Sequence, residues 1–300
     1  MFKYIFVAIF CIALHGQVQN PGFEQPSSLV YYPGAKTFIV SNLKGAENVR
    51  NSYANLILIS NPFERPAKNK FKILHSNSGK QKDIQAPVKL ILDGDTLIVG
   101  DSRQVALFDV DGYTLKPKKL ILLKQIMHLK SMALTDDGDL YLSDHQNSRI
   151  YKITDLYSAD HKVEAVTNKI PSPAGLLYED GFLYIVSTSH NMIYVYNCLK
   201  SEPEKKIRLT ENVSSPGVGF VDICRGSEGE FYLLHKDRES VYLFNEEWAG
   251  KRSVKLFKNG LIAPRSITYH PNQNALLVTQ DFANSIALIP ALKMRPALGK

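Results

Sequence analysis

The sequence has few cysteines and no sustained helical period. Beyond its first residues it also has no apolar run long enough to cross a membrane. Of its three cysteines, Cys11 lies in an apolar N-terminal stretch, which leaves Cys198 and Cys224. These two fall on different predicted strands, which favours two separate thiols, although an oxidising compartment would permit a disulfide. Without a helical period, the chain is predicted to be all-β.

Several chemical motifs are absent as well. We find no nucleophile elbow, no phosphate-binding loop, no zinc-ligand spacing and no cysteine–histidine pattern of a thiol enzyme. The common hydrolase, nucleotide-binding and zinc-finger classes therefore have no support in local sequence. Any site must be assembled from residues that are far apart along the chain.

A phrase of alternating apolar residues around a turn recurs six times. The copies begin at Pro26, Pro87, Lys130, Pro173, Val221 and Pro264. The spacings between successive starts are 61, 43, 43, 48 and 43 residues. A period of about forty residues that encodes strands is typical of a propeller blade. The sequence therefore predicts an all-β, six-bladed β-propeller with four-stranded antiparallel blades around a central channel.

The third copy illustrates the four strands expected in each blade. Its strands are predicted at Ser131–Thr135, Leu140–Ser143, Arg149–Thr154 and Lys162–Val166, separated by turn-forming residues. The sixth copy offers only three strands. We therefore expect Val18–Phe23 to supply its missing outer strand and to close the ring, which hides the sheet edges between blades.

The N-terminus resembles an export signal. Lys3 precedes the apolar run Tyr4–Leu14, and the small residue Gly16 follows it. The run is too short to span a bilayer, so we expect residues 1–17 to be a signal peptide, cleaved near Gly16–Gln19. The alternative is a buried first strand. The prediction is a secreted or periplasmic protein with one propeller domain over residues 18–300 and no transmembrane segment in the mature chain.

The formal net charge of +7 is concentrated on predicted fourth strands. Two interpretations stay open: lysines on outer strands discourage edge-to-edge association, or the lysine-rich rim attracts anionic surfaces such as lipid headgroups or polyanionic glycans. Nucleic acid is not expected, because the charges are spread around the rim without stacking aromatics. Asn212–Ser214 also matches a glycosylation sequon. The basic clusters are Lys68/Lys70/Lys72, Lys116/Lys118/Lys119, Lys205/Lys206/Arg208 and Lys251/Arg252/Lys255/Lys258.

One mouth of the channel is the expected binding site. Inner strands begin there and second strands end there, so polar groups converge around a concave surface that suits a small molecule or a protein partner. We align the inner-strand starts as Ser27, Val88, Ser131, Ala174, Asp222 and Arg265. The second-strand ends align as Asn42, Asp101, Asp144, Thr188, His235 and Gln280. The binding candidates are Asp222, Arg265, Ser27, Asn42, Asp101, Asp144 and His235.

Each candidate also has a purely structural interpretation. Asp101 and Asp144, with His145 and His235 nearby, have the groups for acid–base work or metal binding. An Asp at the end of a strand also starts a turn by accepting hydrogen bonds from backbone amides. Arg265 either neutralises a carboxylate across the channel or binds a carboxylate or phosphate ligand.

Three of the repeats carry a family resemblance. FEQPSSLVYYPGAKTFIVSN and SPAGLLYEDGFLYIVS resemble the six-bladed propellers of the senescence marker protein/gluconolactonase family. SMALTDDGDLYLSDHQNSRIYKIT resembles an NHL repeat. The resemblance extends from about Phe23 to Leu292 and implies the propeller fold.

The resemblance also implies a divalent metal held in the channel by Glu, Asn and Asp. At those three positions this chain has Ser27, Ala174 and Asp222, so only Asp222 is a candidate metal ligand. A hard cation such as calcium requires six or more oxygen ligands. We therefore expect a ligand- or partner-binding module without a cofactor. The open alternative is a lactone or ester hydrolase with a rearranged calcium or zinc site.

Overall fold

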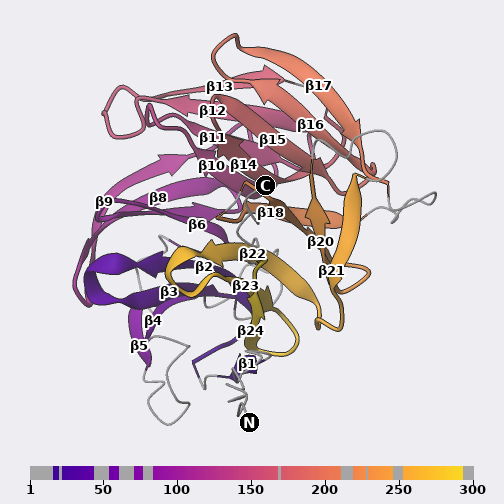
Figure 1. Ribbon diagram of the computed structural model, residues 1–300. Helices are drawn as coiled ribbons and strands as arrows, with labels where there is room; N and C mark the ends of the chain where they lie inside the picture. The colour runs from indigo at the N-terminus through magenta and orange to yellow at the C-terminus, as the bar shows by residue number, and fades with distance from the viewer. Residues whose placement is uncertain are drawn as a thin grey trace, which may run out of the picture.

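The computed structural model of the protein is a ring of six four-stranded antiparallel sheets around a central channel (Figure 1). The structure describes residues 16–19, 22–43, 54–60, 71–76, 84–167, 170–210, 219–227, 229–245 and 253–292. In this part of the chain, helical structure is limited to two short 3-10 turns, η1 (Pro33–Ala35) and η4 (Pro271–Gln273). The predicted six-bladed propeller is confirmed.

Each blade runs from an inner strand at the channel to an outer strand at the rim. Blades 1 and 2 are β2 (Pro26–Tyr32), β3 (Thr37–Asn42), β4 (Asn55–Ser60) and β5 (Phe71–Ser76), then β6 (Pro87–Asp93), β7 (Thr96–Asp101), β8 (Gln104–Asp111) and β9 (Thr114–Leu122). Blades 3 and 4 are β10 (Leu129–Leu134), β11 (Leu140–Asp144), β12 (Arg149–Thr154) and β13 (Lys162–Thr167), then β14 (Pro173–Glu179), β15 (Phe182–Ser187), β16 (Met192–Asn197) and β17 (Glu202–Arg208). Blades 5 and 6 are β18 (Phe220–Arg225), β19 (Phe231–His235), β20 (Ser240–Phe244) and β21 (Val254–Lys258), then β22 (Pro264–His270), β23 (Ala275–Gln280) and β24 (Ser285–Pro290).

The ring is closed by an N-terminal strand, as expected, but that strand lies earlier in the chain than predicted. β1 (Gly16–Gln19) pairs with β24 and becomes the outer strand of blade 6. The predicted range Val18–Phe23 overlaps it at only two residues. Pro21 cannot donate to a strand ladder, and the buried side chain of Val18 already packs in the cluster between blades 6 and 1.

The core lies within and between the sheets. Tyr141, Phe231 and Tyr232 are buried, and Phe182 and Tyr184 pack partly buried against the cluster between blades 4 and 5. The alternation of second strands predicts this packing for all five aromatic residues. In the described part of the chain, hydrophobic clusters fill the spaces between neighbouring blades.

Two sequence predictions fall outside the described residues. They are the signal segment Tyr4–Leu14 and the sequon Asn212–Ser214. Within the part of the chain that the structure describes, no helix is both long enough and apolar enough to span a membrane.

Candidate binding site in the central channel

A β-bulge near the start of each inner strand divides the channel into two layers of residues. In blades 1, 2, 3, 5 and 6, the first residue of the inner strand pairs with the last residue of the second strand, and one unpaired residue follows. Bulges re-aim side chains at barrel and channel rims. The bulge residues form the mouth layer: Ser27, Val88, Lys130, Val221 and Arg265. The next residues form the inner layer: Ser28, Lys89, Ser131, Asp222 and Ser266.

This register corrects the sequence alignment of the inner strands. The alignment set Ser131 and Asp222 level with Ser27 and Arg265, whereas the register places both one residue deeper. Lys130 is the residue of blade 3 that occupies the mouth layer. A single-residue bulge shifts the register without changing the apolar pattern, so the pattern alone did not reveal it.

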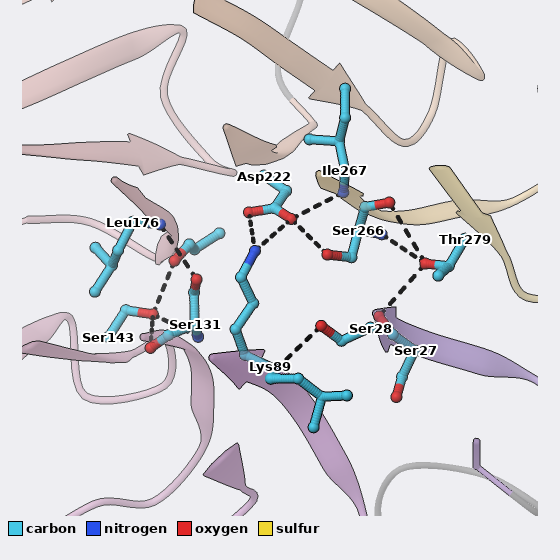
Figure 2. A network of polar contacts seen from close by, with 12 residues as sticks. Ser27, Ser28, Lys89, Ser131, Ser143, Leu176, Asp222, Ser266, Ile267 and Thr279 are labelled. Atoms are coloured by element: carbon cyan, nitrogen blue, oxygen red, sulfur yellow. Dashed lines mark hydrogen bonds and ion pairs between the residues drawn. The ribbon is translucent and has the colours of Figure 1, made fainter. Parts of the chain in front are cut away.

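In the inner layer, an ion pair crosses the channel. The Nζ atom of Lys89 lies 3.0 and 2.8 Å from the two carboxylate oxygens of Asp222 (Figure 2). Lys89 belongs to blade 2 and Asp222 to blade 5, which stand opposite each other in a ring of six. The two side chains are only 15% and 4% exposed. Such a buried pair holds its partners strongly, because removing either one leaves an uncompensated charge.

Asp222 also joins blade 5 to blade 6. Its Oδ2 atom accepts hydrogen bonds from the Ser266 hydroxyl at 2.7 Å and from the Ile267 backbone N–H at 3.0 Å. With Lys89, this gives the carboxylate three donors from two other blades. Its oxygens are therefore engaged by the protein itself.

The hydrogen bond from the Ile267 N–H to Asp222 is an interblade latch. The same latch occurs at two other blade junctions, with serine in place of aspartate. At each of these junctions, an inner-layer side chain of an odd-numbered blade accepts the N–H of an inner-strand residue in the following blade (Figure 2). The repeat thus acts as its own control and favours a structural role for Asp222. The pairs are Ser28 with Leu90 at 3.1 Å, Ser131 with Leu176 at 3.3 Å and Asp222 with Ile267 at 3.0 Å.

Gly175 allows the inner strands of blades 4 and 5 to approach closely. A Cβ atom at this position would lie 2.5 Å from the Cα atom of Asp222. That distance is much shorter than van der Waals contact, so only glycine fits without moving backbone. The Pro-Ala-Gly sequence of blade 4 therefore serves the packing around Asp222.

Asp101 and Asp144 tie incoming loops to the ends of second strands. Asp101 accepts backbone N–H groups of Gln85, Ala86 and Ser102. Asp144 accepts those of Met127 at 3.0 Å and of His128 and Asn147 at 3.2 Å. This repeated pattern favours the interpretation that both carboxylates organise turns.

The other candidates of blades 1 and 5 are buried and hydrogen-bonded. The Ser27 hydroxyl donates to the Pro87 carbonyl at 2.7 Å, and the Asn42 amide donates to the Gly22 carbonyl at 2.8 Å. The Nδ1 atom of His235 accepts the Arg238 N–H at 3.2 Å. These side chains join chain segments at the mouth and present little surface to a ligand.

Lys130 in the mouth layer is a cation whose pKa is strongly perturbed. Burial and the nearby Lys236 ammonium lower its pKa to about 8, while Asp222 and Asp281 oppose that shift. The charges that act on it belong to blades 5 and 6, so the Lys130 ammonium lies within electrostatic reach of the far side of the mouth. Lys130 begins the third repeat but was not among the residues predicted for the site.

Two histidines adjoin Lys130 at the mouth. The rings of His128 and His145 are 5.9 Å apart, and the Nε2 atom of His145 lies 2.9 Å from the Thr188 hydroxyl. Burial lowers the pKa of both imidazoles, and the Lys130 charge lowers both further. At neutral pH both rings are therefore largely uncharged hydrogen-bonding groups.

Arg265 pairs with Asp281 at the same mouth. An Nη1–Oδ2 distance of 2.9 Å joins them, and both side chains are mostly buried. The other carboxylate oxygen, Oδ1, is buried and accepts no hydrogen bond from a described residue. The structure thus brings Arg265 together with Lys130, Lys236 and Asp281 in one polar cluster, which we call the mouth cluster.

The donor set of the inner layer does not fit a divalent metal. Both oxygens of Asp222 face the Lys89 ammonium, and the neighbouring inner-layer side chains offer only hydroxyls. Among the described residues, no three His, Cys, Asp or Glu side chains are grouped as metal ligands would be. A metal would have to displace a cation that the chain itself supplies.

The rim lysines that the structure describes lie on outer strands, as predicted. On β9, Lys116 pairs with Asp111 and Lys118 with Asp109, both at 2.9 Å and largely exposed. Lys68, Lys70, Lys251 and Arg252 lie outside the described residues. Exposed ion pairs of this kind contribute little to stability.

The two cysteines are free thiols, in agreement with the sequence. Cys198 is half-buried and Cys224 is buried. Burial raises the pKa of both thiols. Neither is therefore activated as a nucleophile.

No protein-family model and no curated protein matches the chain. Solved structures do share its architecture. A presumed 6-phosphogluconolactonase from Bacteroides fragilis aligns with a TM-score of 0.62 at 17% identity, over 90% of this chain and 81% of its own. A Bacteroides thetaiotaomicron protein of unknown function has a TM-score of 0.63 at 13% identity, over 91% and 71% of the two chains. A streptogramin B lyase has a TM-score of 0.58 at 12% identity, over 93% and 87%. The resemblance to gluconolactonase-type propellers is therefore confirmed for the fold.

Proposed function

We propose that the protein is a binding module that holds a small anionic molecule at the channel mouth. The observation that carries this proposal is the group of charges at the mouth, where Lys236 and Asp281 act on the buried Lys130 and Arg265 pairs with Asp281. A carboxylate or phosphate would compensate the excess positive charge. Its oxygens would also meet the hydrogen-bonding groups of His145 and Thr188.

The inner layer supports binding in preference to metal-dependent hydrolysis. A lactonase of the type that the resemblance implies would use a metal in the channel, but Lys89 and two further donors engage Asp222. We therefore assign Asp222 to the scaffold beneath the site. Arg265 keeps its role as a candidate ligand contact.

The state of Lys130 makes the proposal testable by pH. An anion favours the protonated ammonium, so binding to the mouth cluster should weaken as Lys130 loses its proton above a pKa of about 8. Citrate and inorganic phosphate are suitable probes for isothermal titration calorimetry at low ionic strength. Between pH 8 and pH 10 we expect citrate affinity to fall by roughly tenfold per pH unit.

A matched pair of variants separates the mouth from general charge effects. Lys130→Met should weaken citrate binding at least tenfold and abolish its pH dependence in this range. Lys255→Met removes one exposed charge from outer strand β21 and should leave both unchanged. Equal affinities in the wild type and Lys130→Met, or no binding of either probe, would refute the proposed site.

We also propose that the protein is exported, so that this site faces an extracytoplasmic medium. The basis is the apolar run Tyr4–Leu14 behind Lys3. Because β1 begins at Gly16, removal of residues 1–17 would take two residues from the closing strand, whereas cleavage before Gly16 would preserve it. Sequencing the N-terminus of the native protein tests this, and a chain that still starts at Met1 would contradict it.

A further inference from the structure

A separate cavity lies between blades 3 and 4, on the third and fourth strands and away from the channel. Its volume is about 300 Å³, and its walls come from the end of β13, from β16 and from β17. Most of the lining is apolar or aromatic: Ile170, Tyr194, Val195, Tyr196 and Pro203. Cavities of this size and composition hold small molecules with an apolar body.

Lys206 gives this cavity a charge that the corresponding positions of other blades lack. Its strand position pairs with Tyr194, and its Nζ atom lies 5.5 Å from the centre of the Tyr194 ring. In blades 1, 2, 3 and 5, the residues at the equivalent position are all apolar. They are Ile73, Leu120, Ala165 and Leu256. Among these five blades, a cation therefore replaces an apolar residue only in blade 4, whose strands β16 and β17 supply most of the cavity lining.

The rim of the cavity has a net positive charge. Lys205 and Lys206 both line it, and Glu204 is the one acidic residue of the lining. The Glu204 carboxylate accepts a hydrogen bond from the Asn197 amide at 3.5 Å. An anionic head group at the rim would therefore be attracted, and a cationic one repelled.

We propose that this cavity binds an amphipathic carboxylate, with its apolar chain against Tyr194, Tyr196 and Ile170 and its head group at Lys206. Burial of the chain supplies most of the affinity, since each methylene removed from water is favourable. The ammonium of Lys206 selects for the charge. This site is independent of the anion site at the channel mouth, because it shares none of its residues.

Calorimetric titration with decanoate below its micelle concentration tests the proposal. We expect saturable binding of decanoate, roughly tenfold weaker binding of octanoate because two methylenes are missing, and weaker binding of the neutral decanol. A decanol affinity equal to that of decanoate, or no dependence on chain length, would overturn the proposal.

Variants that copy or contrast with the other blades locate the site. Lys206→Leu reproduces blades 2 and 5, so we expect it to fold, and it should weaken decanoate about fivefold while sparing decanol. Thr167→Phe, which fills the cavity from β13, should abolish binding of both. Lys255→Leu on β21 and Lys130→Met at the mouth should leave both affinities unchanged. If decanoate affinity fell as much in these two controls as in Lys206→Leu, the assignment would be overturned.

Discussion

The inner layer and the mouth cluster of the channel hold similar charged groups but use them differently. In the inner layer, Lys89 and Asp222 neutralise each other, and the carboxylate also bonds to Ser266 and Ile267. At the mouth, burial lowers the pKa of Lys130, and the like charge of Lys236 lowers it further. Charges that neutralise each other stabilise the ring, whereas like charges that gather in one place attract an oppositely charged ligand. The difference teaches that a buried charge with a perturbed pKa is a better candidate for ligand binding than one that an opposite charge already engages.

The largest effect should come from breaking the inner layer. Asp222→Ala leaves the Lys89 ammonium buried without its partner and removes the latch to Ile267. We expect a loss of about 3–5 kcal/mol in the free energy of unfolding, measured by urea denaturation. Asp136→Ala, at an exposed turn, should change it by less than about 0.5 kcal/mol. A change in Asp222→Ala as small as in this control would show that the pair is not structural.

Gly175→Ala should cause a smaller loss in the free energy of unfolding. The added methyl group would lie 2.5 Å from the Cα atom of Asp222, so the inner strands of blades 4 and 5 must separate. Overpacking of this kind costs about 1–3 kcal/mol. Thermal unfolding checks the expectation. An unchanged melting temperature would mean that the two strands can accommodate a methyl group at this position.

At the mouth, removing a charge should raise the free energy of unfolding, whereas in the inner layer it should lower it. The pKa of Lys130 is about 8 in the folded protein, against 10.5 for an exposed lysine. The contribution of Lys130 to stability is therefore most favourable above pH 10.5 and falls as the pH drops to 8, because the folded state resists taking up the proton. Lys130→Met should raise the melting temperature by about 2–4 °C at pH 7. The difference from the wild type should vanish near pH 11. A variant that is less stable than the wild type at pH 7 would contradict this account of the mouth.

The smallest effect is expected at the rim, where charges are paired but exposed. Lys118→Gln removes the ion pair between Lys118 on the outer strand β9 and Asp109 on the third strand β8 of blade 2. The change in unfolding free energy should stay below about 0.5 kcal/mol and should disappear at high salt. A loss above about 1 kcal/mol would show that rim charges stabilise the ring as inner-layer charges do.

The sequence predicted the blades well because each blade is local. β12 was predicted with the bounds Arg149–Thr154 that the structure has, and the other three strands of blade 3 differ by only one or two residues at an end. The repeat forced these assignments, since strand, turn and strand recur within about forty residues. The closing strand was placed too late, because pairing with β24 depends on contacts from the other end of the chain.

The channel was predicted less well, for two physical reasons. A bulge hides the true level of Asp222 and left Lys130 out of the mouth, since adding one residue does not disturb the apolar pattern. The partner of Asp222, Lys89, lies 133 residues away on the opposite blade. No local pattern links such a pair. The bulge and the six-fold count must both be known before the two residues can be matched.

The most direct test of the central claim is the unfolding free energy of the double variant Lys89→Met/Asp222→Ser. It replaces the ion pair by the serine that serves the same latch in blades 1 and 3, while methionine fills the channel without charge. If Asp222 is a charged version of that latch, urea denaturation should give a stability within about 1 kcal/mol of the wild type. A loss of about 3–5 kcal/mol, as expected for Asp222→Ala alone, would contradict the claim that the inner layer is scaffold.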